Sequence, residues 1–238
     1  MAPPDPERDG LMPAILSAYE RLAPRMARAG FPPRVGAARG PLAIAAHLLG
    51  VTEFLVASQT DRGDVGRLLD LTTELCIAWL AAQLARMDSP LGILVLDDLV
   101  GMLGPDDAEE FACPRLRRVF GTFSGLVRFF HNDTPNPAVY EGLGGCGIDA
   151  FNLSHKADLA DAGRRLGPGV VLMGNLPPLD LLARGTPAEC RAAAEALLAR
   201  VAEVGPIVIS AGGGVSPGTP VENLQAVVAA VRASGGVA

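Results

Sequence analysis

Residues 126–136, LVRFFHNDTPN, run from an apolar segment directly into His131, Asn132 and Asp133. The first part is apolar without alternation, which is typical of a strand covered on both faces of a sheet. In a parallel barrel the carboxyl ends of the strands form one rim, and catalytic groups converge there. We therefore interpret the apolar run as barrel wall and the polar triplet as part of a site at the rim.

The same pattern recurs along the chain. Six strand-like runs are recognisable, at 34–39, 92–98, 126–132, 148–154, 169–175 and 206–212. Helical segments accompany them, at 11–30, 62–87, 106–121, 156–166, 187–204 and 220–233. Strands separated by helices predict βαβ units and a parallel sheet. The predicted fold class is α/β, a TIM-barrel-like (β/α)₈ domain that is incomplete, because a full barrel needs eight strands. An open doubly wound sheet is the alternative, but no G-x-G-x-x-G follows the first strand.

Length, charge and cysteine content limit the classes of protein to which this chain can belong. The 238 residues fit a flexible tail at 1–10, which is acidic and proline-rich, and a single domain at 11–238. The net charge of −6 argues against nucleic acid and against attraction to an acidic membrane surface. The longest apolar runs are far shorter than a membrane span. The four cysteines form no C-x-x-C pair, so we expect reduced, mostly buried thiols in a cytoplasmic protein.

Polar or flexible residues follow almost every predicted strand. The candidate catalytic residues are Asp97, His131, Asp133, His155 and Lys156. The candidate substrate-binding residues are Asp98, Asn132, Asn152, Asn175, Gly212, Gly213 and Gly214. The alternative is that about half of these side chains cap helices or form turns, as 133–137 could do. His47, on an apolar segment, is interpreted as a structural histidine.

Two of these groups have a more specific chemical interpretation. Lys156 is the one lysine among 20 basic residues, and unlike arginine a partly buried lysine can lose its proton. We expect it to point into the rim; the alternative is that it opens the helix at 156–166, where a cation opposes the helix dipole. The glycines at 212–214 could bring backbone N–H groups close to an anion, or could form only a flexible connection.

A metal ion is a further possibility at this rim. His131, Asp133 and His155 are side-chain types that ligate zinc and other divalent ions. None of the cysteines lies at a strand end. We therefore predict no bound metal and no cofactor.

Two longer segments resemble the uroporphyrinogen decarboxylase superfamily, which includes the heme-pathway decarboxylase and zinc-dependent methyltransferases. They are 171-VLMGNLPPLDLLARGTPAEC-190 and 208-VISAGGGVSPGTPVENLQAVVAAV-231, and the similarity extends through 95–120 and weakly to 40–50. The resemblance implies a (β/α)₈-type barrel whose members often dimerise.

The departures from the family patterns are informative. The methyltransferases carry a zinc-binding H-x-C where this chain has His131, Asn132 and Asp133, and a third cysteine ligand where it has Gly213. The resemblance therefore does not extend to the zinc thiolates. The resemblance also implies that the chain begins near the family's third strand, so we expect no counterpart of the arginine-rich motif and essential aspartate of the decarboxylases.

Three functional hypotheses follow. The first is a metal-independent lyase that performs elimination or decarboxylation on a small anionic metabolite, in biosynthesis. The second is a methyltransferase with an altered metal site built from His131, Asp133 and Asp97. The third is a non-catalytic barrel subunit of another protein. Six strands leave two open sheet edges, so we expect a homodimer or a second subunit, or the N-terminal helix, to cover the edges near 34–39 and 206–212.

Overall fold

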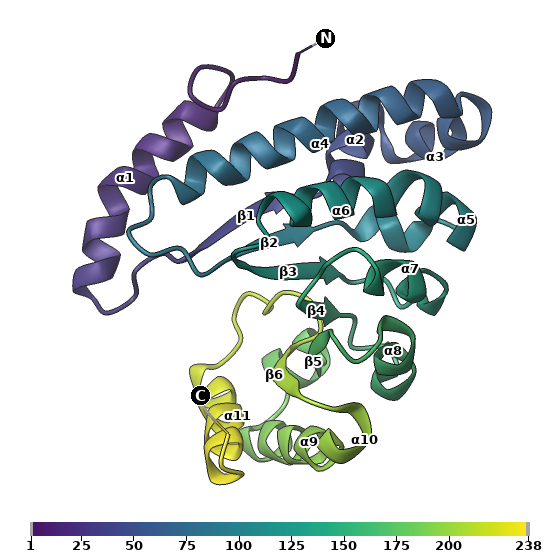
Figure 1. Cartoon of the computed structure of the whole chain (residues 1–238). Helices are drawn as coiled ribbons and strands as arrows, with labels where there is room; N and C mark the ends of the chain where they lie inside the picture. Colours follow the sequence, from purple (N-terminus) through teal and green to yellow (C-terminus); the bar gives the residue numbers. More distant parts are fainter. Residues whose placement is uncertain (1, 237–238) are drawn as a thin grey trace.

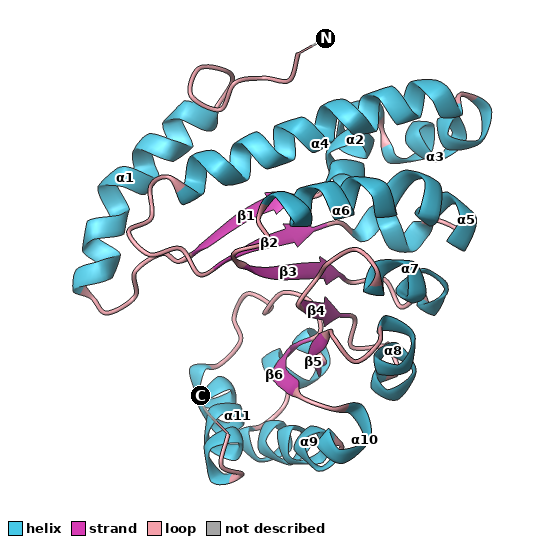
Figure 2. Ribbon diagram, in the orientation of Figure 1, coloured by secondary structure: helices cyan, strands magenta, loops and turns pink. Residues whose placement is uncertain are grey.

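The structure is a computed structural model that describes residues 2–236, without the side chain of Ala202. Six parallel strands form one sheet in chain order, and the predicted strands are confirmed (Figure 2). They are β1 (Val35–Arg39), β2 (Gly92–Leu96), β3 (Val127–Asn132), β4 (Ala150–Leu153), β5 (Val171–Leu176) and β6 (Ile207–Ala211). β1 and β6 lie at opposite ends of this order and do not pair, so the sheet is open.

The helices pack mainly on one side of the sheet. They are α1 (Met12–Arg28), α2 (Pro41–Leu49), α3 (Val51–Thr60), α4 (Arg62–Leu84), α5 (Pro105–Asp107), α6 (Cys113–Thr122), α7 (Tyr140–Gly144), α8 (Leu159–Leu166), α9 (Pro187–Ala199), α10 (Val201–Val204) and α11 (Val221–Ala233). Figure 1 shows α4 and α6 beside β1–β3, and α9 and α11 beside β5 and β6. No single helix in the described chain is long and apolar enough to cross a membrane, whereas α2 and α3 meet the length and composition criteria only as a pair bent by 104°.

Several predicted helix boundaries are wrong. The helix predicted at 156–166 begins at Leu159, because Asp158 accepts a hydrogen bond from the N–H of Asp161 and so forms the N-cap. The helix predicted at 106–121 consists of α5, a π-helical turn at Ala108–Ala112 and α6. The segment 41–60, for which no helix was predicted, forms α2 and α3; the amphipathic period is absent from α2 because most of it is buried.

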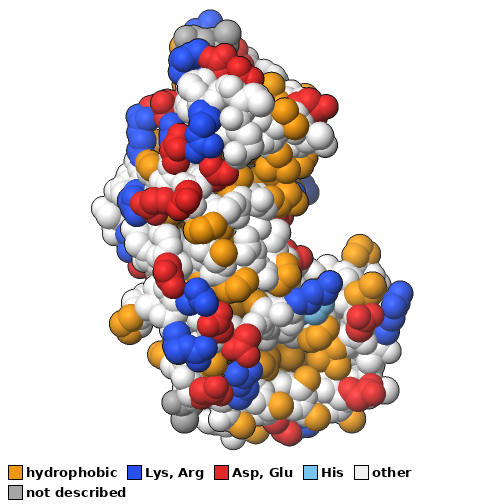
Figure 3. All heavy atoms as spheres, turned by 90° about the vertical axis from the view of Figure 1, so that its right-hand side faces the viewer, with side chains coloured by type: hydrophobic (Ala, Val, Ile, Leu, Met, Phe, Trp, Pro, Cys, Tyr) orange, Lys and Arg blue, Asp and Glu red, His pale blue; other side chains and the backbone are white. Residues whose placement is uncertain are grey.

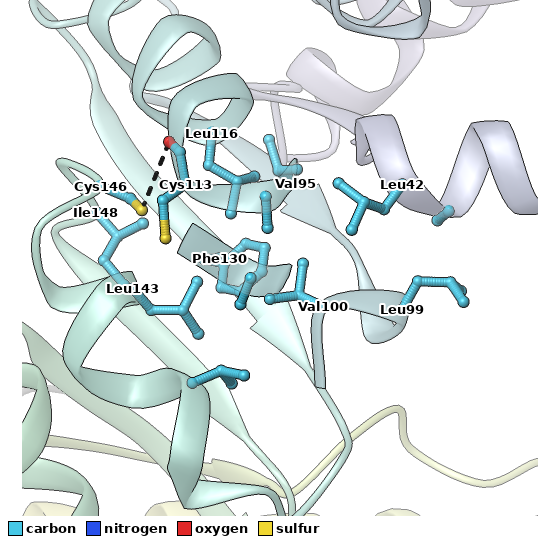
Figure 4. Packing of buried hydrophobic residues seen from close by; sticks show 14 of the residues in the cluster. Leu42, Val95, Leu99, Val100, Cys113, Leu116, Phe130, Leu143, Cys146 and Ile148 are labelled. Carbon is cyan, nitrogen blue, oxygen red and sulfur yellow. Dashed lines mark hydrogen bonds between the residues drawn. The ribbon is translucent and has the colours of Figure 1, made fainter. Parts of the chain in front are cut away.

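The core lies between the sheet and the helices. Val95, Phe130 and Phe151 occupy neighbouring register positions on β2, β3 and β4, and all three are fully buried. The Phe130 and Phe151 rings stack with centroids 5.7 Å apart, and Phe120 of α6 meets Phe130 edge-on at 6.2 Å. Figure 4 shows Phe130 surrounded by side chains of this core. Because alternate strand residues point to opposite faces, the neighbours of these side chains point to the other face of the sheet, which we call the inner face.

The N-terminal segment is anchored. The Glu7 carboxylate accepts two hydrogen bonds from Arg86, at 3.0 and 2.9 Å, and Arg86 also pairs with Glu20 of α1 at 2.8 Å. Arg86, which follows α4, thus links Glu7 to α1, and the flexible tail at 1–10 stays a prediction. Residue 1 of that tail, and residues 237–238 of the predicted domain, lie outside the described residues.

Candidate active site at the carboxyl ends of the strands

His131 is held in one orientation at the end of β3. Its Nδ1 lies 2.7 Å from Asn152 Oδ1, on the neighbouring β4. The Asn152 amide cannot be reversed without loss, because its Nδ2 donates to the carbonyls of Met173 and Ala211, each at 3.0 Å. An amide oxygen only accepts, so Nδ1 of His131 carries the proton and Nε2 is left for another partner.

That partner is Asp98. Its Oδ1 lies 3.7 Å from His131 Nε2, within ion-pair distance when the ring is protonated. The same oxygen accepts the backbone N–H of Asp133 at 2.8 Å, which fixes the carboxylate. Arg39, the last residue of β1, approaches the other oxygen at 4.0 Å. Asp98 therefore links β1, β2 and β3 around one imidazole.

Arg39 was missed at the sequence level. It ends an apolar strand, which is the same position that identified the other candidates, and this was the available signal. The carbonyl of Ala211 was also missed, because a backbone acceptor leaves no signature in a sequence.

Asp133 extends from β3 towards the glycine loop after β6. A Cβ placed on Gly213 would lie 3.0 Å from Asp133 Oδ2, so the carboxylate lies directly against this glycine. Gly213 has a φ of +109°, a conformation that other residues rarely adopt. Across residues 2–236 we find no acceptor for the N–H of Gly213 or Gly214. The loop therefore presents free donors beside a carboxylate, and an anion bound there would have to avoid Asp133.

His155 lies against the same loop. A Cβ on Gly212 would come 2.3 Å from the backbone nitrogen of His155, so only glycine permits this contact. The His155 Nδ1 is buried and has no hydrogen-bond partner in the described part of the chain. Buried polar atoms normally have a partner, so an unpaired Nδ1 is a candidate ligand contact.

Lys156 follows in the turn between β4 and α8. Its side chain is exposed, and none of the ion pairs recorded within residues 2–236 involves it. Because α8 begins at Leu159, Lys156 does not open that helix, and the alternative interpretation of this residue is wrong. In Figure 3 a histidine and a basic side chain lie together at the rim of a hollow on the carboxyl-end face.

Asp97 and Asn132 lie on the helix side of the sheet. The Asp97 carboxylate has no exposed surface and accepts the N–H groups of Leu42 and Ala43, at 2.9 and 3.0 Å. It thereby satisfies the first donors of α2, and burial raises its pKa to about 7. Asn132 donates to the Asp97 carbonyl and accepts the N–H of Thr134. The predicted catalytic role of Asp97 and binding role of Asn132 are not supported, because neither side chain reaches the inner face.

Asn175 lies near the end of β5, and its side chain contacts the loop that follows β4. Its Nδ2 donates to the carbonyls of Ser154 and Ala157, at 3.2 and 3.0 Å. These two carbonyls flank His155 and Lys156. The amide of Asn175 therefore holds the loop that carries these candidates, and its substrate contact stays a prediction.

The donor set does not fit the zinc site of the methyltransferase branch. The described residues contain no group of three His, Cys, Asp or Glu side chains placed to hold a metal ion. The positions of the two family thiolates, Asp133 and Gly213, do lie side by side, but they offer one carboxylate and no side chain. The described residues therefore do not fit the zinc of that branch.

Fold and site together define an open, TIM-barrel-like α/β protein with its polar groups at the carboxyl ends of the strands. The uroporphyrinogen decarboxylase (URO-D) family model matches residues 1–234. The chain belongs to this family.

Its relatives include two kinds of enzyme. The methylcobamide:CoM methyltransferase MtaA of Methanosarcina barkeri is 27% identical over 92% of this chain and 63% of its own. The uroporphyrinogen decarboxylase of Nocardia farcinica (strain IFM 10152) is 31% identical over 70% of this chain and 49% of its own. The chain thus spans less than two thirds of the length of either relative. A solved methyltransferase from Methanosarcina mazei shares the fold, with a TM-score of 0.83 and 24% identity over 98% of this chain and 70% of its own.

Proposed function

We propose that the chain is a metal-independent lyase that acts on a small anionic metabolite by decarboxylation or a related elimination. The observation that carries the proposal is the chain of contacts from Asn152 through His131 to Asp98. The contact with Asn152 places a proton on Nδ1 of His131, and Nε2 of the same ring faces the Asp98 carboxylate. This arrangement suits a general acid, because the aspartate stabilises the imidazolium that delivers the proton.

The anion would be bound at the glycine loop. The free N–H groups of Gly213 and Gly214 and the exposed ammonium of Lys156 are the donors available at the rim. Backbone donors in a glycine-rich turn form anion-binding concavities. His155 Nδ1, which has no partner among residues 2–236, would supply a further contact.

In the decarboxylation form of this reaction the bond between the carboxylate and its carbon breaks, and carbon dioxide leaves. The electron pair that remains on carbon takes the proton from His131 Nε2. Solvent then restores the proton to the ring. Asp98 and Asn152 keep the imidazole in place throughout.

The test is release of carbon dioxide from a panel of small 3-oxo and aromatic carboxylates. We expect His131→Gln to lower the rate at least ~100-fold, since general acids contribute about 10²–10⁴. His47→Gln on α2 is the matched control, because His47 is exposed and lies outside the site. Full activity of the His131→Gln protein on a turned-over substrate would rule out the proposed acid.

A second candidate function is methyl transfer, which the similarity to MtaA over 92% of the chain favours. Asp97 cannot join His131 and Asp133 in the altered metal site of that hypothesis, because it is enclosed on the opposite face. Methylcobalamin and coenzyme M are the probes, with and without added zinc. Demethylation of the cobalamin that requires zinc and is lost in His131→Gln would favour this candidate over the lyase.

A further inference from the structure

Two of the four cysteines lie together, far from the inner face. Cys113 is the first residue of α6, and Cys146 lies in the turn between α7 and β4. Both are buried, with 1% of each residue exposed. The two residues are 33 positions apart in the chain, and Cys146 Sγ lies 3.8 Å from the backbone carbonyl oxygen of Cys113, the contact drawn as a dashed line in Figure 4.

Gly142 brings the two sulfur atoms together. Cys146 Sγ lies 3.2 Å from the Gly142 carbonyl oxygen. A Cβ placed on Gly142 would lie only 2.9 Å from Cys113 Sγ. Both thiols thus contact the same residue, and the missing side chain of that glycine provides the space for the second sulfur. The π-helical turn directly before Cys113 is of a kind often found at functional sites.

The surroundings make the two thiols chemically different. Hydrogen bonding with Cys113 lowers the pKa of Cys146, and the Arg117 guanidinium lowers it further. The same contact, with burial, raises the pKa of Cys113. Arg117 is held over this turn by the Gly145 carbonyl at 3.2 Å and by Glu109 at 3.0 Å. Arg117, held beside the turn that carries Cys146, favours the Cys146 thiolate, and a thiolate is the form that attacks a disulfide.

A surface pocket lies beside the buried thiol pair. Glu109, Arg117, Gly142 and Gly145 line a surface pocket of about 350 Å³ on this side of the molecule. Neither cysteine lines this pocket, but Gly142, which contacts both sulfur atoms, does. The other two cysteines have no such setting, and burial raises the pKa of Cys76 to about 12.

We propose that Cys113 and Cys146 form an intramolecular disulfide by exchange with a low-molecular-weight organic disulfide. The Cys146 thiolate attacks one sulfur of that disulfide, forms a mixed disulfide and releases one thiolate. Cys113 then loses its proton and attacks the Cys146 sulfur, which forms the internal bond and releases the second thiolate. Two protein thiols are oxidised and one small disulfide is reduced to two thiols. The proposal is independent of the lyase function, because these residues lie in the helical layer.

The experiment treats the reduced protein with glutathione disulfide and then counts free thiols with Ellman's reagent in denaturant. The count is expected to fall from the four free cysteines to two. Peptide mapping without reduction is expected to join Cys113 to Cys146. The midpoint of thermal unfolding is expected to rise by several degrees, because a crosslink restricts the unfolded chain.

Two variants complete the test. Cys190→Ala removes a buried cysteine outside the pair and is expected to lose two thiols as before. Cys113→Ala is expected to form no internal crosslink and to leave Cys146 with a single glutathione. Four free thiols after treatment of the unaltered protein, or a crosslink mapped to a different pair, would overturn the proposal, and neither measurement depends on whether a variant folds.

Discussion

At the scale of single residues, Asp97 is a carboxyl group enclosed at the N-terminus of α2. Desolvation raises its pKa to about 7, although two backbone N–H groups favour the charged form. In the unfolded chain the same group titrates near 4. The folded protein therefore holds a proton that the unfolded chain has lost across the interval between these two values, and stability falls as pH rises through it.

This predicts a specific pH dependence of unfolding. Between pH 5 and pH 8 the free energy of unfolding of the unaltered protein should fall by about 2 kcal/mol relative to Asp97→Asn, which does not titrate. Asparagine can accept only one of the two N–H groups, so the variant should be less stable by about 1–3 kcal/mol near pH 5. Urea unfolding at both pH values provides the measurement. Parallel curves for the two proteins would mean that Asp97 does not titrate in this range.

Lys156 carries a second prediction at this scale. Lys156→Arg keeps the positive charge but replaces the compact ammonium, which the proposed function uses to bind the anion, with a wider planar guanidinium. We expect the variant to lose most of the lyase rate and to keep its unfolding midpoint, since Lys156 is exposed. Rate and thermal unfolding are measured on the same preparation. A fully active variant would restrict Lys156 to a charge contact at most.

At the scale of elements, the loop after β6 depends on glycines that are not equivalent. Gly213 has a φ of +109° and lies against the Asp133 carboxylate, whereas a Cβ on Gly214 would meet nothing within 4 Å. Gly213 is therefore conformationally constrained, and its neighbour Gly214 serves as an unconstrained control in the same loop.

Alanine at these two positions should act differently. Gly213→Ala is expected to destabilise the protein by about 1–2 kcal/mol, because the side chain disfavours positive φ, and to weaken binding of inorganic phosphate at the loop. Gly214→Ala is expected to change stability by less than about 0.5 kcal/mol. Urea unfolding and phosphate titration by calorimetry test both. Equal effects of the two substitutions would refute the assigned loop geometry.

At the scale of the whole molecule, the sheet ends at β1 and β6 without closing. Unpaired strand edges are sites of association with other chains. α1 also exposes apolar side chains, among them Ile15, Leu22 and Met26. Met12 and Ile15 of this helix line a pocket together with Ala38 and Arg39 of β1, so α1 lies beside one of the two edges.

We expect association in solution as a consequence. If the chain self-associates, sedimentation velocity should show a species with at least twice the mass of one chain. If a different subunit covers the edges, the chain should form a stable complex when that subunit is added. Ile15→Arg on α1 should weaken self-association if this edge is used, and Arg191→Glu on the exposed face of α9 serves as the control. A single monomeric species across the concentration range would contradict the expectation.

The sequence by itself determined the six strands, their parallel arrangement and the family, because continuous apolar runs and glycine-containing motifs are local signals. The tertiary structure decided which polar residues belong together. His131 lies near the end of β3 and Asp97 directly follows β2, but alternating side-chain directions send His131 to the inner face and Asp97 to the helix layer. The two donors that hold Asp97 come from α2, 55 and 54 residues earlier in the chain. No local pattern encodes such a contact, because it exists only once the sheet has brought the two segments together.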